Sequence, residues 1–114
     1  MNIKIIKDKI GLAKAQEIGK EFYDEMVKGA VDVNREVFAL GGEYHIDAGN
    51  FLVEDGSKQS DIWGFNIVFT KDNKYFLEYT AMINIKPAAG NRDMEIQDSK
   101  IKDRIKKIVE SKIK

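Results

Sequence analysis

The segment Ile62–Thr70, IWGFNIVFT, constrains the fold most strongly, because its large apolar residues alternate with the rest. Alternate side chains of a strand point to one face, so this spacing predicts a strand with one apolar face. Lys71–Lys74 has the length and composition of a tight hairpin turn. Tyr75–Lys86 then alternates in the same way, until Pro87 ends the run. We therefore predict a long antiparallel hairpin, with Trp63 and Phe65 in the core rather than on a base-stacking surface.

A helical spacing precedes this hairpin. Apolar residues recur three or four positions apart from Leu12 to Leu40, which predicts one long helix, or two helices broken near Gly29. Glycine commonly follows a helix where the backbone turns left-handed, so Gly41-Gly42 is expected to end it. The stripe consists of Leu12, Ala15, Ile18, Phe22, Met26, Ala30, Val33, Val37 and Leu40.

After the two glycines the spacing becomes alternating again. It predicts a strand over Glu43–Asp47, a turn at Ala48–Asn50 and an extended segment over Phe51–Glu54. A polar loop is expected over Asp55–Ser60.

The two ends of the chain complete the pattern. Asn2–Lys7, rich in isoleucine, predicts a first strand, and Ala88–Gln97 a polar loop. Asp98 and Ser99 are good N-caps for a final helix lined by isoleucines. We expect a single domain over residues 1–114 of the α+β class, with helices on one face of a mostly antiparallel sheet. The expected order is strand, one or two helices, three strands, helix.

Composition excludes several classes of protein. The 114 residues include no cysteine, so disulfide scaffolds, zinc ribbons and cysteine nucleophiles are excluded. No segment has the apolar length of a signal peptide or membrane span, so we expect a soluble cytoplasmic protein without a membrane partner. Nineteen basic and nineteen acidic residues cancel, which disfavours nucleic acid as a partner. Locally, residues 41–61 carry a net charge of −4 and residues 98–114 a net charge of +4.

The only histidine marks the first candidate site. On the predicted strand, Glu43, His45 and Asp47 would project from one face. Two carboxylates beside an imidazole are a plausible set for a divalent metal or for acid–base catalysis. Equally, they are the wet side of an ordinary half-buried strand. No cofactor follows from the sequence.

A polar sheet face is the second candidate site. If the aromatic faces of the hairpin meet the helices, the opposite faces carry Gly64, Asn66, Glu78, Thr80, Asn84 and Lys86. Gly90-Asn91-Arg92 could grip an anion, since arginine suits phosphate and carboxylate, or Arg92 could pair with the acidic segment. Asp55-Gly56-Ser57 is typical of a turn that satisfies its own backbone. The candidate ligand-binding residues are Glu54, Asp55, Gln59, Asn66, Asn84, Lys86, Asn91 and Arg92.

Three functions are compatible with these features. The first is a binding or interaction module that uses the polar sheet face and the Asp55–Asp61 loop, with a homodimer as one arrangement. The second is a small metal-dependent or acid–base hydrolase or nuclease centred on His45. The third is RNA binding through the basic last helix, for which a charged outer face is weak evidence.

Several separated motifs resemble a small prokaryotic family of unknown function. They are MVKGAVDVNREVFALGGEYHID, LVEDGSKQSDIWGFNI and INIKPAAGNRD, followed by an isoleucine-rich basic helix, and they span residues 26–114. The resemblance implies no activity, substrate or partner. The positions that match the family's pattern are Glu43, His45, Asp47, Glu54, Asp55, Gly56, Ser57, Gln59, Trp63, Gly64, Asn66, Asn84, Pro87, Asn91 and Arg92. The chain departs from it in a shorter hairpin at Lys71–Asn73 and in Tyr79-Thr80, where an acid is more usual.

The expected order of elements is also similar to that of small toxin endoribonucleases of toxin–antitoxin pairs. Those proteins are typically strongly basic, whereas this chain is neutral. Fold analogy alone establishes no activity.

Overall fold

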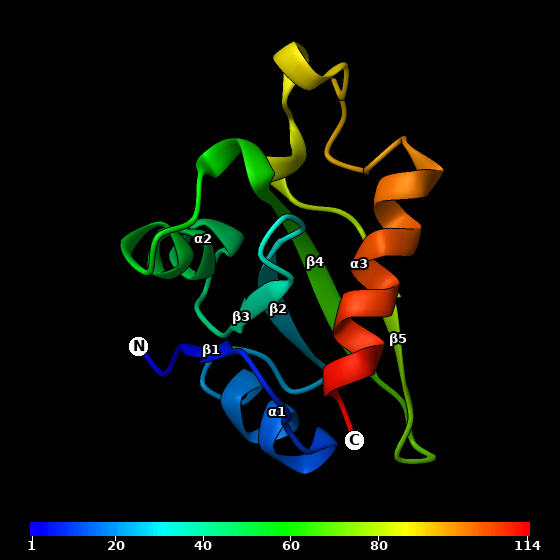
Figure 1. Ribbon diagram of the computed structural model, residues 1–114. Helices are drawn as coiled ribbons and strands as arrows, with labels where there is room; N and C mark the ends of the chain where they lie inside the picture. The colour runs from blue at the N-terminus through cyan, green and yellow to red at the C-terminus, as the bar shows by residue number, and fades with distance from the viewer.

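A computed structural model describes all residues of the chain, 1–114. Five antiparallel strands form one sheet in the order β1-β3-β2-β4-β5 (Figure 1). The α+β class with an antiparallel sheet is therefore confirmed. The strands are β1 (Lys4–Ile6), β2 (Met26–Asp32), β3 (Val37–Leu40), β4 (Ile62–Phe69) and β5 (Tyr75–Glu78). The helices are α1 (Leu12–Gly19), α2 (His45–Glu54) and α3 (Ser99–Lys112), with short 3-10 turns at Gln59–Asp61, Met82–Asn84 and Pro87–Ala89.

The larger core lies between the sheet and helices α1 and α3. Trp63, Phe65 and Ile67 of β4 point into it, as their alternation predicts. The rings of Phe38 and Phe65 meet edge to face, with centroids 5.9 Å apart. Both Trp63 and Phe65 are buried, so their prediction as core residues is confirmed.

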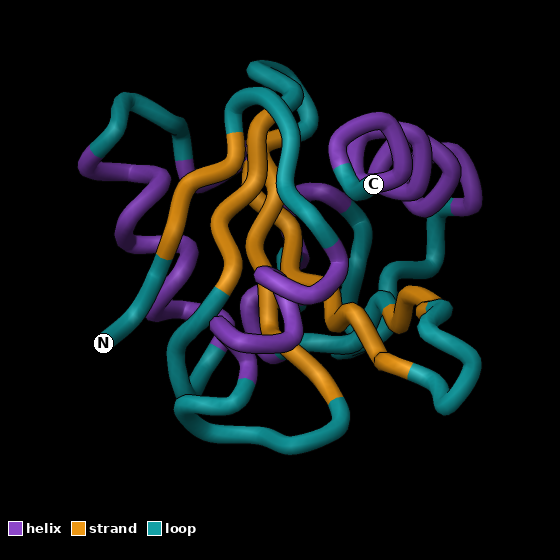
Figure 2. The backbone as a smooth tube through the Cα atoms, turned by 90° about the horizontal axis from the view of Figure 1, so that it is seen from below, coloured by secondary structure: helices purple, strands orange, loops and turns teal.

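Helix α2 covers the opposite face of the sheet, which corrects the expectation that all helices lie on one face. Ala48 and Leu52 of α2 pack on Ala30, Ala39 and Ile62. Figure 2 shows the strands between α3, which lies beside the C-terminus, and α2 on the other side. The basic helix and the acidic segment thus lie on opposite sides of the sheet, and they do not pair within one chain.

The helix predicted over Leu12–Leu40 is correct only as far as Gly19. Residues 26–40 form β2 and β3 instead, joined by a tight turn in which Asp32 Oδ1 accepts hydrogen bonds from the N–H groups of Asn34 and Arg35. Strand β2 is central, and apolar residues are buried on both of its faces, Val27 and Val31 on one and Ala30 on the other, so the alternation is lost. What remains fits a helical spacing by coincidence.

The strand predicted over Glu43–Asp47 is wrong. Helix α2 begins at His45, and the Asp47 carboxylate accepts a hydrogen bond from the Tyr44 N–H at 2.9 Å. The turn at Ala48–Asn50 and the extended segment at Phe51–Glu54 are likewise helical. Gly41 and Gly42 have φ of 119° and 93°, so the left-handed backbone is present, but it follows a strand.

The hairpin prediction is confirmed for β4 and the first third of its partner. Strand β5 ends at Glu78, whereas the prediction extended it to Lys86. Residues 79–97 form instead a loop that passes the start of β4, projects beyond the sheet and returns to α3 (Figure 1). The first strand and the final helix are confirmed, and Asp98 Oδ1 accepts from the Lys100 N–H at 2.9 Å. None of the helices combines the length and the apolar character that crossing a bilayer requires.

Candidate ligand-binding groove

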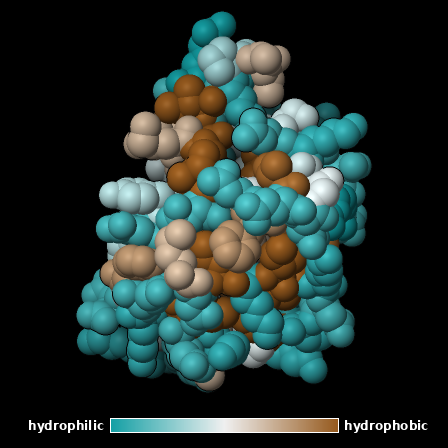
Figure 3. All heavy atoms as spheres, turned by 90° about the vertical axis from the view of Figure 1, so that its left-hand side faces the viewer, coloured by the Kyte–Doolittle hydropathy of each residue, from teal (hydrophilic) through white to brown (hydrophobic).

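A hollow of about 610 Å³ opens on the α2 side of the sheet, between the start of α2 and the 79–97 loop. Figure 3 views this side, where apolar side chains gather among hydrophilic ones. We call it the methionine groove. It is lined by Met26, Lys28, Tyr44, His45, Ile46, Asn66, Glu78, Thr80, Met82, Ile83 and Met94. Apolar walls with a few polar groups on the floor are typical of ligand sites.

The sheet register builds the polar floor. Lys28 of β2 lies opposite Asn66 of β4, and Asn66 lies opposite Glu78 of β5. Directly paired residues of antiparallel strands project from the same face, so these side chains form one row across three strands. The prediction that Asn66 and Glu78 share a polar face with His45 is therefore correct, although His45 reaches it from a helix.

His45 is held by a short chain of hydrogen bonds. Its Nε2 lies 2.6 Å from Asn66 Oδ1, and Asn66 Nδ2 donates to Glu78 Oε1 at 3.3 Å. Because Glu78 accepts from the amide nitrogen, the amide oxygen of Asn66 faces the imidazole and accepts from it. Nε2 of the neutral ring therefore carries the proton, and Nδ1 is left as an acceptor.

Burial keeps this imidazole neutral. His45 is 9% exposed, and its desolvation lowers its pKa below the ordinary range. The hydrogen bonds with Asn66 and with the Phe65 backbone oppose that shift in the pKa, and the charge of Lys28 adds to it. At neutral pH the groove therefore presents an uncharged histidine.

The ammonium group of Lys28 lies against two aromatic rings. Its Nζ lies 4.9 Å from the centroid of Tyr23 and 5.6 Å from that of Tyr44, both suited to cation–π attraction. Tyr23 is itself anchored, because its hydroxyl donates to the Glu43 carbonyl. The ammonium thus forms no ion pair with a carboxylate.

The proposed set of Glu43, His45 and Asp47 does not assemble. Asp47 caps α2, Glu43 is exposed before the helix, and His45 turns toward β4. No group of three or more histidine, aspartate or glutamate side chains in the chain is arranged to hold a metal ion. The helical start of α2 is the reason, since residues two apart on a helix point in different directions.

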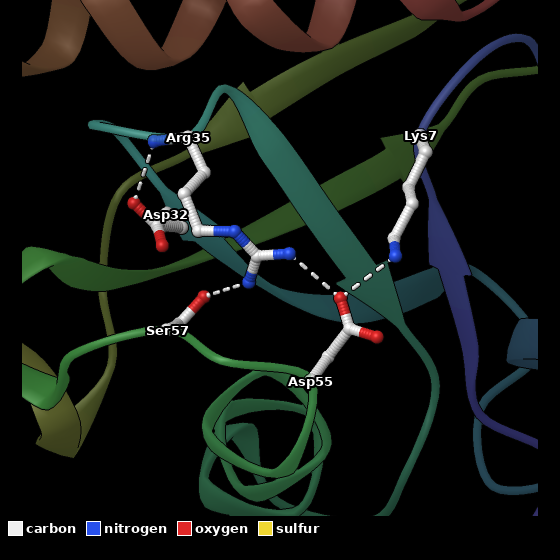
Figure 4. Close-up of polar contacts among 5 residues, drawn as sticks. All are labelled: Lys7, Asp32, Arg35, Asp55 and Ser57. Atoms are coloured by element: carbon white, nitrogen blue, oxygen red, sulfur yellow. Dashed lines mark hydrogen bonds and ion pairs between the residues drawn. The ribbon is translucent and has the colours of Figure 1, made fainter.

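The EDGS segment serves a separate contact (Figure 4). Arg35 donates to Ser57 Oγ and to Asp55 Oδ2, each at 2.7 Å, and Lys7 lies 2.9 Å from the same Asp55 oxygen. The Arg35 guanidinium, together with Lys7, holds the pKa of Asp55 below its usual range. Asp32 Oδ2 lies buried without a partner beside this cluster. These contacts join the end of α2 to the β2–β3 turn and β1.

The other predicted binding residues either hydrogen-bond to the protein's own backbone or lie exposed outside the groove. Asn84 and Asn91 are buried. The Asn84 side chain hydrogen-bonds the backbone of Gly64 on β4 and the carbonyls of Tyr79 and Met94, and the Asn91 side chain hydrogen-bonds the backbone within the 79–97 loop. Lys86 Nζ donates to the Gln59 carbonyl at 2.9 Å and lies over the Trp63 ring. Glu54 and Arg92 are exposed, and neither lines the methionine groove. Arg35, not Arg92, pairs with the acidic segment.

Sequence reasoning missed Lys28 and the three methionines. Lys28 stands alone as a cation within the apolar run MVKGAVD, which is a usable signal once that run is recognised as a strand. Nothing in the sequence brings Met26, Met82 and Met94 together, because they belong to β2 and to the two sides of a loop.

The comparisons with known proteins identify a family. Residues 4–112 match the family described as "Protein of unknown function (DUF5674)". The chain belongs to this family. No curated protein matches the chain. No solved structure matches it either. This agrees with the resemblance to an uncharacterised family, and the groove geometry remains the guide to function.

Proposed function

We propose that this DUF5674 protein is a binding module whose methionine groove receives an apolar side chain of a partner peptide. One observation carries the proposal: every methionine after Met1 lines the same hollow. Methionine is unbranched and polarizable, so it adapts to partners of irregular shape and is favoured at such surfaces.

The exposure of the walls supports this proposal. Met82 is 73% exposed, and Tyr44, Ile46 and Met94 are also exposed. A partner that covered the groove would bury the apolar surface of all four side chains. Clustered exposed apolar side chains commonly mark binding surfaces. The hydroxyl groups of Tyr44 and Thr80 in the groove lining offer hydrogen-bonding groups of the kind that peptide backbones need.

The test uses protein labelled with ¹³C at the methionine methyl groups and short capped peptides as probes. The peptides are Ac-Ala-Ala-X-Ala-Ala-NH₂, in which X is leucine, methionine, phenylalanine or alanine. We expect the apolar peptides to shift the methyl signals of Met26, Met82 and Met94 saturably, and to leave that of Met1 unchanged. The all-alanine peptide should have little effect.

Met82→Gln should weaken this binding, and Phe76→Gln is the matched control. Phe76 is also apolar and half-exposed, but it lies on β5 outside the groove. If no peptide produces a saturable shift, or if both variants weaken binding equally, the proposal is wrong.

A second candidate function is acid–base hydrolysis by His45, supported by the burial that lowers its pKa. A general base needs an unprotonated nitrogen near neutral pH, and the neutral ring of His45 meets that condition. Water would be the nucleophile. Hydrolysis of p-nitrophenyl ester and phosphodiester substrates tests it: any activity should be lost in His45→Gln and kept in Phe76→Gln. Activity that survives His45→Gln would exclude this role.

A further inference from the structure

The methionine groove continues into a second hollow of about 510 Å³, which shares Met26 and Glu78 with it. Three carboxylates line this extension: Asp24, Glu25 and Glu78. All three are exposed, and none lies within ion-pair distance of a lysine, arginine or histidine. We call this the acidic end of the groove.

Lys28 on the groove floor does not neutralise the acidic end. Lys28 shares the floor with Glu78, but Asn66 lies between them, and the Lys28 ammonium is placed over the rings of Tyr23 and Tyr44. The three carboxylates therefore have no cationic partner, and they lie directly beside an apolar surface. A cation that reached them would replace no existing ion pair.

The opposite end of the surface has the opposite character. A third hollow of about 210 Å³ shares Ile46 and Ile83 with the methionine groove and contains Lys86. Lys86 is fixed there by the Gln59 carbonyl and the Trp63 ring. The surface thus runs from a lysine, across an apolar centre, to three carboxylates, and this order distinguishes one end of an occupant from the other.

We infer that the occupant is an extended peptide segment in which lysine or arginine stands close to an apolar anchor residue. The anchor fills the methionine groove, and the cationic side chain lies against Asp24, Glu25 and Glu78. In an extended chain, residues two apart point the same way and lie about 7 Å apart, so the base is expected two positions from the anchor. This inference rests on the proposed function and adds the chemistry of the partner.

The experiment compares three capped peptides that differ in one side chain. They are Ac-Ala-Leu-Ala-Z-Ala-NH₂, in which Z is lysine, glutamine or glutamate, measured by the same methionine methyl signals at low salt. We expect the lysine peptide to bind about fivefold more tightly than the glutamine peptide, which is the scale of an exposed ion pair. The glutamate peptide should bind most weakly, and the differences should shrink in salt.

Matched variants locate the effect. The combined change Asp24→Asn, Glu25→Gln and Glu78→Gln should abolish the preference for lysine while the glutamine peptide still binds. Glu78→Gln keeps an oxygen that can accept from Asn66, so the floor is preserved. Glu110→Gln, an exposed acid on α3 across the sheet, is the control and should keep the preference.

The outcomes separate this inference from the proposed function. Equal binding of the three peptides, or a preference that survives the triple substitution, would overturn the inference and leave the apolar groove intact. If none of the peptides binds, both the inference and the proposed function are overturned.

Discussion

Replacing Asn84 tests how the wall of the groove is held in place. Asn84 is fully buried, and its side chain lies where strand β5 no longer pairs with β4. Its Oδ1 accepts from the Gly64 N–H at 2.7 Å, and its Nδ2 donates to the Gly64 carbonyl at 3.0 Å. The carboxamide thus bonds to β4 much as the next peptide group of a partner strand would. Through it, the 79–97 loop that carries Met82 and Met94 is fixed to the sheet.

The expected cost of Asn84→Ala follows from the groups that lose a partner. The Nδ2 group also donates to the carbonyls of Tyr79 and Met94, but these accept as well from the N–H groups of Ile96 and Ala81. Only the two groups of Gly64 are left unpaired. A buried polar group without a partner costs about 1–3 kcal/mol, so we expect a loss of about 3 kcal/mol. The free energy of unfolding of a natural domain is about 5–15 kcal/mol, so the variant should still fold.

Asn84→Asp provides a sharper comparison. A carboxylate can still accept from the Gly64 N–H. Its second oxygen, however, would face the three carbonyl oxygens to which Asn84 Nδ2 donates in the unsubstituted protein. We therefore expect Asn84→Asp to be less stable than Asn84→Ala at pH 7, and to recover part of the difference at pH 4, where the acid is protonated.

The assay is urea unfolding followed by the fluorescence of Trp63, which is the only tryptophan and is buried beside Gly64. Asn50→Ala, at an exposed position of α2, is the control and should change stability by less than about 0.5 kcal/mol. An Asn84→Ala protein as stable as that control would refute the reasoning. So would an Asn84→Asp protein more stable than Asn84→Ala at pH 7.

Three further changes test other parts of the structure. Because burial lowers the pKa of folded His45 below the unfolded value of about 6.5, stability should be complete above that pH and fall as the pH drops toward the folded pKa; urea midpoints between pH 7.5 and 5 should show a flatter curve for His45→Gln. Arg35 holds the pKa of Asp55 low, so this carboxylate stabilises the fold above about pH 4 and loses that contribution in more acidic solution; acid titration by circular dichroism should show a weaker dependence for Asp55→Asn. A side chain at Gly64 would collide with Ala81, so Gly64→Ala should lower the unfolding free energy by about 1–3 kcal/mol, and adding Ala81→Gly should restore part of it; no recovery in the double variant would show that the contact is not the cause.

The start of α2 shows why the local pattern was misleading. The alternation in GGEYHID is genuine, but it falls where a chain leaves two left-handed glycines and begins a helix. Tyr44 is not a favoured N-cap residue, and the capping carboxylate of Asp47 stands three positions later. The prediction therefore assigned His45 to a strand instead of to helix α2. His45 nevertheless lies on the predicted side of the sheet, because α2 packs against that side.

The sequence by itself determined the elements whose apolar residues face one core. Helices α1 and α3 each have one apolar side and one exposed side, so a period of about 3.6 could be recognised. Strand β4 is buried on both faces, but large apolar residues on one face alternate with Gly64 and Asn66 on the other, so its period of two could be recognised. Strand β2 could not be recognised, because apolar residues lie on both of its faces, Val27 and Val31 on one and Ala30 on the other, and no alternation results. The groove also required the tertiary structure. Its three methionines, its histidine and its carboxylates meet only because the sheet register and the 79–97 loop bring distant segments together, and no local spacing encodes that meeting.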